Sequence, residues 1–450
     1  MKFFKAYDIR GKVPSELNEC FAEQLGRAYA VEFTPNVVVV GHDIRLSSLS
    51  LHQALIKGLL DMGVNVISLG LCGTEEVNYQ TSALHADGGI MITASHNPMD
   101  YNGMKLCLKD SVPLSEATGL LKLRDRIIHQ KLGTTHPQKG QLTKFIEKTD
   151  YIHHLLQYIN VQKLKPLRVV VNSGNGCAAP IIDLLEQYLP CELIKIHHEP
   201  DGSFPNGIPN PLLPDHRADT SKAVQVYGAD LGVAWDGDCD RCFFFDHEGH
   251  FIDSYYMIGL IAKQMLAESK NQSIVTDGRL VWNTKQQVKA AGGRLVISKG
   301  GHSFMKQSMR EFNAIYGGEL SGHHYFRDFY YCDSGMIPWL LVIALLSSSD
   351  LKLKDYVEES IHQFPCSEEM NFKVNHVEDV IHQIDLQLGQ KAIQRNTLDG
   401  LTLEFIDWRL NVRSSNTEPL LRLNIECKYS QDLLASKVDL LLSIIEPFKI

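Results

Sequence analysis

Residues Thr93 to Pro98 (TASHNP) place a serine next to a histidine in a stretch whose composition favours a turn. The apolar run before them, Gly88 to Ile92, predicts a short buried strand, and Pro98 prevents a helix from continuing through this point. Ser95 is therefore expected at the carboxyl end of a strand, where α/β proteins commonly carry their chemistry. A serine beside His96 is typical of a nucleophile with a neighbouring base. A plain Ser/Asn/Pro turn without chemistry also accounts for this stretch.

Three carboxylates stand at alternate positions in the run from Asp236 to Arg241 (DGDCDR), directly after the apolar run from Leu231 to Trp235. Such carboxylates repel one another unless a cation lies between them, and Gly237 lets the backbone fold so that alternate side chains converge. Oxygen ligands favour a hard cation such as Mg²⁺. An EF-hand is excluded because Arg241 and His247 stand where that loop needs glycine and glutamate. The alternative is a solvated acidic turn.

The segment from Arg413 to Pro419 (RSSNTEP), with Arg422 beyond it, has the composition of a phosphate-binding loop. Arginine offers a planar pair of donors to a phosphate, and hydroxyls, an amide and backbone N–H groups can bind the remaining lone pairs. A polar hairpin loop with an incidental arginine is the alternative.

The segment from Gly317 to His324 (GGELSGHH) places alternating polar side chains in a glycine-framed loop. Glu319 and Ser321 could there bind neighbouring hydroxyls of a sugar. A turn whose histidines are satisfied locally accounts for the segment equally well.

Further cationic and proton-transferring groups are Arg10 before Gly11, Lys105 ten residues after Ser95, and His302 after two glycines. Each could belong to an ordinary surface loop. Together with the serine and the three aspartates, they describe phosphoryl transfer. That chemistry needs a nucleophile, a metal, cationic groups that hold phosphate, and a proton-transfer group.

The elements that position these residues follow a repeated pattern of apolar strand, polar or glycine-rich loop, and helix. Continuous apolar strands that alternate with helices indicate sheets covered on both faces, and hence related α/β domains. The strand, loop and helix are Val37–Val40, Gly41–Arg45 and Leu51–Met62 in the first unit; Leu167–Val171, Asn172–Gly176 and Ala179–Tyr188 in the second; and Ile274–Val275, Thr276–Arg279 and a helix reaching Ala291 in the third.

The C-terminal part differs, because its expected strands precede one closing helix, an order that fits an α+β domain with an antiparallel sheet. Domain breaks are expected near 145–150, 250–256 and 363–370. The expected strands are Phe372–Val374, Leu401–Phe405, Arg409–Val412 and Leu420–Cys427, and the helix is Leu433–Ile445.

Composition narrows the function classes. A chain of 450 residues is long enough for three or four domains, and 44 basic against 53 acidic residues imply no surface for nucleic acid. The N-terminus lacks the apolar core of a signal peptide, and the run from Met336 to Leu346 is too short to span a membrane and predicts a buried helix. Ten scattered cysteines, of which Cys239 and Cys242 form a lone CxxC pair, fit a reducing cytoplasm better than a zinc or disulfide framework.

In this order, TASHNP, DGDCDR, GELSGH and RSSNTEP resemble the four signature loops of the α-D-phosphohexomutase superfamily, and the resemblance runs from Tyr7 to Arg422. The stretches from Asn206 to Pro211 and from His323 to Asp328 look like bacterial phosphomannomutases of the capsule and GDP-mannose pathway. Phosphoglucosamine mutases usually have glutamine where Leu320 stands.

The resemblance implies three related mixed α/β domains and a smaller C-terminal α+β domain around a central cleft, here expected at 1–147, 148–252, 253–365 and 366–450. It implies that Ser95 is a phosphoserine, and that Ser95, Asp236, Asp238 and Asp240 hold Mg²⁺. The implied substrate-binding residues are Arg241, Glu319, Ser321, His323, Arg413, Ser415, Asn416 and Thr417, and the implied catalytic residues are Ser95, Arg10, Lys105 and His302, with Lys105 and His302 as proton-transfer candidates.

The function implied is a cytoplasmic phosphomannomutase that interconverts mannose 6-phosphate and mannose 1-phosphate through a hexose 1,6-bisphosphate. Only a small sugar phosphate is expected as partner, with no nucleic acid or membrane, for a monomer or a homodimer. Gly300 departs from the family, which commonly has threonine there. The alternatives are a phosphoglucomutase or dual-specificity enzyme, a non-catalytic sugar-phosphate-binding protein, and a serine hydrolase, which the absence of G-x-S-x-G around Ser95 disfavours.

Overall fold

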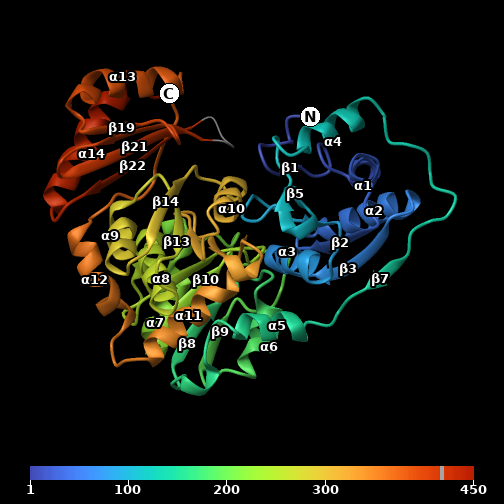
Figure 1. The fold of residues 1–450 in the computed structure, drawn as a ribbon, viewed down its shortest axis with the longest axis horizontal. Coiled ribbons are helices and arrows are strands. Elements are labelled where there is room, and N and C mark those ends of the chain that lie inside the picture. Colours follow the sequence, from blue (N-terminus) through green and yellow to red (C-terminus); the bar gives the residue numbers. More distant parts are fainter. Residues whose placement is uncertain (416–419) are drawn as a thin grey trace. The chain divides into compact units, whose positions relative to one another are not determined.

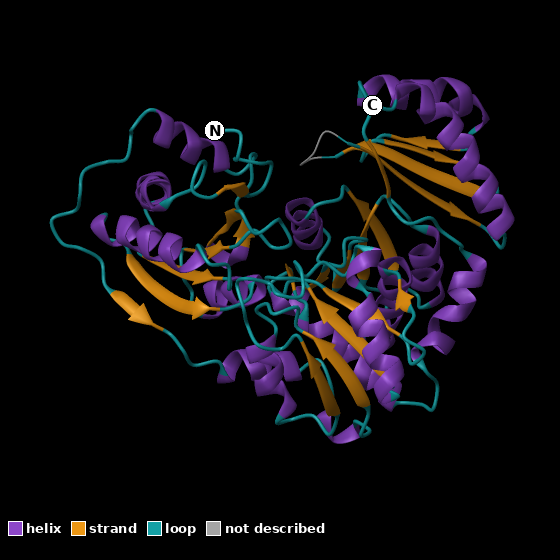
Figure 2. Cartoon of the chain, turned by 180° about the vertical axis from the view of Figure 1, so that it is seen from behind, coloured by secondary structure: helices purple, strands orange, loops and turns teal. Residues whose placement is uncertain are grey.

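The computed structural model describes residues 1–415 and 420–450. The chain forms two compact units, one of residues 1–252 with 322–350 and one of residues 253–321 with 351–450. Figures 1 and 2 show helices and strands throughout the described chain. In the described ranges, no helix combines the length and the hydropathy needed to cross a membrane.

The N-terminal part of the first unit is a mixed sheet in the order β1-β5-β4-β2-β3-β7, with β6 beside β5. β2 runs parallel to β3 and β4, whereas β5 is antiparallel to β4 and β1. The strands are β1 (Ile9–Lys12), β2 (Val37–His42), β3 (Asn65–Leu71), β4 (Gly88–Ile92), β5 (Tyr101–Leu108), β6 (Val112–Pro113) and β7 (Leu142–Lys144).

Helices cover both faces of this sheet. On one face Val38 and Val40 of β2 belong to the core that contains α1 (Glu19–Phe33), α2 (Ser48–Asp61) and α4 (Leu120–Ile128). On the other face Val39 packs with α3 (Thr74–Ala83). The alternation along β2 therefore buries both sides of a continuous valine run, as expected for an α/β layer.

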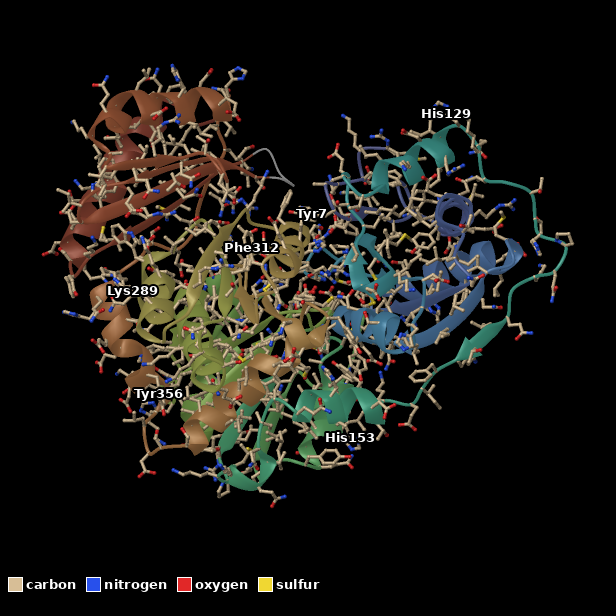
Figure 3. The ribbon with its side chains drawn as sticks, in the orientation of Figure 1. Tyr7, His129, His153, Lys289, Phe312 and Tyr356 are labelled. Atoms are coloured by element: carbon tan, nitrogen blue, oxygen red, sulfur yellow. The ribbon has the colours of Figure 1, made fainter. Side chains whose placement is uncertain are left out.

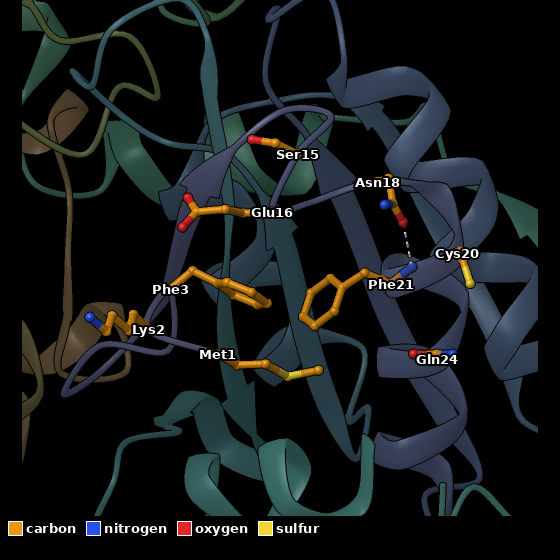
Figure 4. Close-up of a pocket in the computed structure, with 9 residues that line it drawn as sticks. All are labelled: Met1, Lys2, Phe3, Ser15, Glu16, Asn18, Cys20, Phe21 and Gln24. Carbon is orange, nitrogen blue, oxygen red and sulfur yellow. Dashed lines mark hydrogen bonds between the residues drawn. The ribbon is translucent and has the colours of Figure 1, made fainter. Parts of the chain in front are cut away.

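A hollow of about 480 Å³ is lined by N-terminal residues and the start of α1 (Figure 4). Phe3 and Phe21 pack edge to face there with ring centroids 5.1 Å apart. None of the site residues expected from the sequence lines this hollow.

The second part of this unit is the sheet β12-β11-β10-β8-β9, in which β8 is parallel to β9 and β10. The hairpin of β16 (His324–Phe326) and β17 (Cys332–Asp333) and helix α11 (Met336–Ser347) complete the unit. Trp235 Nε1 donates a hydrogen bond of 2.8 Å to the carbonyl of Gly335 at the start of α11. The strands are β8 (Arg168–Asn172), β9 (Glu192–Ile196), β10 (Leu231–Trp235), β11 (Cys242–Phe245) and β12 (Phe251–Ile252), and the helices are α5 (Thr149–Leu156), α6 (Ala179–Glu186) and α7 (Ala218–Tyr227).

In the second unit, residues 253–321 form parallel strands in the order β14-β13-β15, with α8, α9 and α10 packed beside them. Residues 351–450 begin with α12 and continue into the antiparallel sheet β18-β22-β21-β20-β19, whose core includes α13 and α14. Figure 3 shows the side chains, including those of Phe312 after α10 and Tyr356 on α12. The strands are β13 (Ser273–Asp277), β14 (Arg294–Ser298), β15 (Tyr316–Gly318), β18 (Met370–Phe372), β19 (Gln394–Asn396), β20 (Leu401–Glu404), β21 (Trp408–Ser414) and β22 (Leu421–Cys427). The helices are α8 (Ser254–Glu268), α9 (Trp282–Ala290), α10 (His302–Glu311), α12 (Leu353–Gln363), α13 (Val377–Leu388) and α14 (Gln431–Ile445).

The predicted α/β and α+β character is confirmed. The three strand–loop–helix units are present as β2 and α2, β8 and α6, and β13 and α9, with bounds close to those expected. The apolar run at Met336 is the buried helix α11, as predicted. The strand expected at Phe372–Val374 ends earlier, at Phe372, and α13 was not expected from the sequence.

Candidate active site

Ser95 lies three residues beyond the end of β4, in a turn that holds its side chain inside the protein. Its backbone has φ +50°, a left-handed conformation that a serine adopts only when its surroundings fix it. Its N–H donates to Thr93 Oγ1 at 2.8 Å, and its hydroxyl donates to Asp236 Oδ2 at 2.8 Å. The structure therefore brings the predicted nucleophile directly onto the predicted acidic loop.

Arg45 binds the backbone of the serine turn, a role that was not predicted from the sequence. Its guanidinium group donates to four backbone carbonyls, those of Ser95 (2.8 Å), Asn97 (2.5 Å), Pro98 (2.8 Å) and Tyr101 (3.0 Å). The side chain is buried, and its fork geometry lets one group bind several acceptors. Arg45 is thus a positioning residue for Ser95.

The three predicted metal ligands converge after β10. Asp236, Asp238 and Asp240 are fully buried, and each offers an oxygen that lies within 4.8 Å of the others. Lys105 Nζ, on β5, lies 2.6 Å from Asp238 Oδ2 and 2.5 Å from Asp240 Oδ2. Thr74 Oγ1, at the first residue of α3, donates to Asp238 Oδ2 at 2.5 Å. The acidic loop is therefore anchored by two elements of the N-terminal sheet region.

This cluster fits a divalent cation. Asp238 Oδ1 and Asp240 Oδ1 are buried and accept no hydrogen bond from the described residues. Burial, together with the neighbouring carboxylates, raises the pKa of Asp240 well above its usual range. A hard cation bound by these oxygens would give both atoms a partner and would offset the repulsion among the carboxylates. Oxygen donors are also the ligands that Mg²⁺ prefers. The residues present thus suit the Mg²⁺ expected from the sequence.

Two arginines approach the serine loop with Lys105. Arg241 Nη2 lies 2.7 Å from Asp236 Oδ2 and donates to Ser95 Oγ at 3.2 Å. Arg10, on β1, binds Asp8 and donates from Nη1 to Asn97 Oδ1 at 2.5 Å. Burial would lower the pKa of Lys105, but Asp238 and Asp240 outweigh it and raise that pKa. All three side chains therefore carry a positive charge beside the serine loop, where an anionic phosphate would bind.

His96 contacts Ser95 and Arg241 through Nδ1. Burial and the charges of Arg241 and Arg10 hold its pKa well below the usual range. A neutral imidazole that already accepts a hydrogen bond from Arg241 is better suited to shaping this turn than to acting as a general base.

His323 belongs to this same unit. It forms a backbone bridge with Arg241, and its Nε2 lies 3.6 Å from Asp240 Oδ1 and 4.0 Å from Asp333 Oδ2. His323 was expected beside the residues of the sugar loop. Within this unit it lies instead beside Asp240 of the acidic loop. Asp333 is a further residue that the sequence analysis missed.

In the second unit, Glu319 follows β15 and is buried. Its Oε1 accepts from Gly301 N at 2.9 Å and lies 3.4 Å from Arg279 Nη2. Ser321 follows two residues later, and His302 is the first residue of α10, directly after Gly301. The predicted sugar loop and the predicted proton-transfer histidine therefore lie on neighbouring turns of one unit.

The predicted phosphate loop begins at the end of β21. Arg413 Nη2 lies 2.8 Å from Glu369 Oε2, and Ser415 N donates to the carbonyl of Leu420 at 2.9 Å. Arg279 Nη1 lies 3.3 Å from the same Glu369 oxygen. The structure thus joins the sugar loop and the phosphate loop through Arg279 and Glu369. Asn416 and Thr417 lie outside the described residues.

A sequence signal for two of the missed residues exists. Asp43-Ile44-Arg45 and Asp277-Gly278-Arg279 occupy nearly the same place in the repeated pattern, at the carboxyl ends of the strands β2 and β13. In each, the aspartate Oδ1 accepts from the arginine N–H at 3.0 Å, and the side chains pair. The repeat of Asp-x-Arg after a buried strand could have marked both arginines.

A buried serine beside three carboxylates and three cationic side chains, on an α/β scaffold, defines a phosphoryl-transfer enzyme. The sequence matches four domain models of the phosphoglucomutase/phosphomannomutase family: alpha/beta/alpha domain I over residues 1–131, domain II over 149–249, domain III over 253–364, and the C-terminal domain over 364–441. The chain belongs to this family.

Similar proteins agree with this assignment. The chain is 52% identical over 96% of its length to the "Phosphohexose mutases" of Xanthomonas campestris, covering 97% of that protein. It is 49% identical over 99% of its length to a phosphomannomutase of Vibrio cholerae, and 47% identical over 98% to one of Escherichia coli K12, covering 99% and 98% of those proteins. A solved phosphoglucomutase/phosphomannomutase family protein from Burkholderia thailandensis superposes with a TM-score of 0.89 at 30% identity, over 100% of this chain and 98% of that one.

Proposed function

We propose that this enzyme is a phosphomannomutase that interconverts mannose 6-phosphate and mannose 1-phosphate. The observation that carries the proposal is the 2.8 Å hydrogen bond from the Ser95 hydroxyl to Asp236, inside the buried group of three aspartates. Relatives named phosphomannomutase, at 47–49% identity over nearly the whole chain, support mannose as the sugar.

The proposed reaction uses Ser95 as a phosphoryl carrier. The P–O bond of phosphoserine breaks as a new P–O bond forms to the free hydroxyl of the sugar phosphate, giving a hexose 1,6-bisphosphate. The proton of that hydroxyl passes to a protein base. After the bisphosphate has changed its orientation, the same steps in reverse return its other phosphoryl group to Ser95.

Asp236, Asp238 and Asp240, with the phosphoserine of Ser95, are the proposed Mg²⁺ ligands. The cation, when bound, supplies charge neutralisation for the transferring phosphoryl group. Arg10, Arg241 and Lys105 add positive charge on the protein side, in a buried environment where such charge acts strongly.

Lys105 and His302 are the proposed proton-transfer residues. The neighbouring aspartates keep Lys105 protonated, which suits it to stabilise the charge of the leaving oxygen rather than to accept the proton of the sugar hydroxyl. His302 then remains the candidate base of the predicted set. In the same proposal Glu319 and Ser321 bind sugar hydroxyls with His323, and Arg413, Ser415, Asn416 and Thr417 bind the phosphate that does not react.

Phosphoglucomutase activity is the second candidate, because the matching family models carry both names. Mannose and glucose differ only at the C2 hydroxyl, and one hydrogen bond gives limited discrimination. We further propose four domains at 1–147, 148–252, 253–365 and 366–450, a cytoplasmic monomer or homodimer, and a small sugar phosphate as the only partner.

A coupled assay with Mg²⁺ and a trace of hexose 1,6-bisphosphate tests the function. Mannose 1-phosphate, glucose 1-phosphate and glucosamine 1-phosphate are compared at equal concentration. Turnover of mannose 1-phosphate with the highest kcat/KM is expected. Comparable rates on glucose would establish dual specificity instead, and no turnover on any sugar would refute the mutase proposal.

A further inference from the structure

Glu369, one residue before β18, receives three arginine side chains. Its Oε2 lies 2.8 Å from Arg413 Nη2 and 3.3 Å from Arg279 Nη1, and its Oε1 lies 3.1 Å from Arg422 Nη1. Arg413 and Arg422 come from directly paired positions of β21 and β22, and all four residues belong to the second unit. One carboxylate therefore serves as the common counter-ion of a converging group of arginines.

This carboxylate leaves part of the arginine charge unmatched. The side chain of Arg413 is only 8% exposed, and its Nε makes no hydrogen bond to any described residue. Burial, together with the nearby Arg279 and Arg422, lowers the pKa of Arg413, while Glu369 opposes that shift. Arg279 is already paired with Asp277 through two contacts, at 2.9 and 3.0 Å. Arg413 thus has a buried donor available for a second anion.

We propose that Glu369 is an exchangeable internal counter-ion for the non-reacting phosphate of the substrate. Its carboxylate shares the guanidinium groups of Arg413 and Arg422 with that phosphate, and takes these contacts over when the phosphate leaves. This inference rests on the proposed function, because that function places a sugar phosphate at Arg413.

The physical reason lies in the cost of releasing an anion from buried cations. When a phosphate leaves Arg413 and nothing replaces it, the buried guanidinium charge is left without a partner, which is strongly unfavourable. In the proposed reaction the bisphosphate must release both of its phosphates before they exchange places. Glu369 lowers the cost of that release, because its carboxylate lies within 3.1 Å of both Arg413 and Arg422. It also weakens phosphate binding, because it competes for the same donors.

The test compares Glu369→Gln with Glu368→Gln, an exposed neighbour that changes the net charge equally. The dissociation constant of inorganic phosphate is measured by titration calorimetry on the whole chain, and mutase kinetics are measured in parallel. Glu369→Gln is expected to bind phosphate about tenfold more tightly and to lower both KM and kcat. Glu368→Gln is expected to match the unchanged protein. Adding Arg413→Met to Glu369→Gln is expected to remove the gain in affinity.

Unchanged or weaker phosphate binding by Glu369→Gln overturns the proposal, and so does a gain that persists in the double variant. The phosphate titration needs no turnover, so it separates this proposal from the mutase function itself. If Glu369→Gln does not fold, Glu369→Asp keeps the charge but is too short to reach all three arginines. Glu369→Asp is then expected to bind phosphate more tightly than the unchanged protein, and equal affinity would again overturn the proposal.

Discussion

At the scale of single residues, Ser95 shows the best agreement between the sequence motif and the geometry of the site. Its hydroxyl is buried and hydrogen-bonded to a carboxylate more than a hundred positions away, so its place depends on the whole unit rather than on its turn alone. A carrier of phosphoryl groups needs such a fixed oxygen next to a cation site.

Ser95→Ala should lower kcat/KM by at least about a thousandfold, because it removes the oxygen of the proposed phosphoryl carrier. Coupled-assay kinetics and phosphopeptide mapping measure the effect, with circular dichroism as the check on folding. Ser443→Ala on α14, which alters an exposed serine, is the matched control and should leave the rate unchanged. Substantial turnover by Ser95→Ala would show that another group carries the phosphoryl.

Lys105→Met should strengthen divalent-cation binding while it reduces turnover. The ammonium group pairs with Oδ2 of Asp238 and Asp240 and repels a cation bound at the same two carboxylates, so its removal ends an electrostatic competition. Electron paramagnetic resonance with Mn²⁺ measures binding without any need for activity, and a several-fold lower Kd is expected. Lys109→Met, in the turn just after β5, should leave the Kd unchanged. Weaker Mn²⁺ binding by Lys105→Met would mean that the lysine organises the aspartates instead of competing for them.

At the scale of elements, loops after buried strands are held by arginines from neighbouring loops. Arg45, after β2, fixes the turn after β4, and Arg279, after β13, links Glu319 to Glu369. Strands supply the rigid frame, while these buried guanidinium groups set the loop conformations.

Arg45→Lys should reduce kcat about tenfold or more and destabilise the protein by about 1–3 kcal/mol. A lysine has no planar fork, so it cannot bind four carbonyls around Ser95, and some are left buried without a donor. Urea unfolding and coupled-assay kinetics measure the two effects. Arg124→Lys on α4 provides the surface control. An unaffected kcat would show that the serine turn keeps its shape without Arg45.

Gly300 departs from the family's usual threonine, and its surroundings explain why a glycine suits this chain. Its N–H donates to Asp399 Oδ2 at 3.0 Å, and a Cβ at this position would stand 3.1 Å from the same oxygen. Gly300→Thr should therefore push Asp399 away and cost about 1–2 kcal/mol of stability. Thermal unfolding measures this, with Gly278→Ala as control because its Cβ would meet nothing closer than 3.4 Å. A Gly300→Thr variant of unchanged stability would show that Asp399 moves freely.

At the scale of the whole first unit, Glu75 joins three segments that are distant in sequence. On α3, it accepts from Tyr151 of α5 and, through Oε2, from the N–H groups of Gly335 (2.5 Å) and Met336 (3.2 Å) at the start of α11. Burial raises the pKa of Glu75 to about 8, and these donors only partly offset it.

The protonated form of Glu75 therefore favours the folded state. This contribution is complete below the unfolded pKa of about 4.3 and is lost as pH rises through about 8, with each pKa unit corresponding to about 1.4 kcal/mol. Glu75→Gln cannot ionise, so its stability relative to that of the unchanged protein should rise from about pH 4.3 to about pH 8 and stay constant above that. Unfolding free energies between pH 5 and 9 measure this, with Glu116→Gln on the surface as control. Parallel pH profiles for both proteins would mean that the donors keep Glu75 ionised throughout.

Local patterns were enough to predict much of the fold. The valine run of β2 and the apolar runs before Ser95 and Asp236 are strands because continuous apolar residues are buried on both faces of an α/β layer. Helix α13 was missed although Val380, Ile384 and Leu388 recur at helical spacing and are buried in the core of the C-terminal sheet. Lys105 was not assigned to a strand, with a surface loop left as one alternative, and the structure places it on β5.

The sequence by itself determined which chemical groups this enzyme has: a serine after a strand, three aspartates after another, and arginines and glycines in the remaining motifs. These follow from residue type and short-range spacing. Only the tertiary structure decided which groups act on one another. Lys105 reaches an aspartate 133 positions away, Thr74 one that is 164 positions away, and Glu369 gathers three arginines. Such pairings depend on how distant strands meet in a packed unit, and that information is not present in any single stretch of the chain.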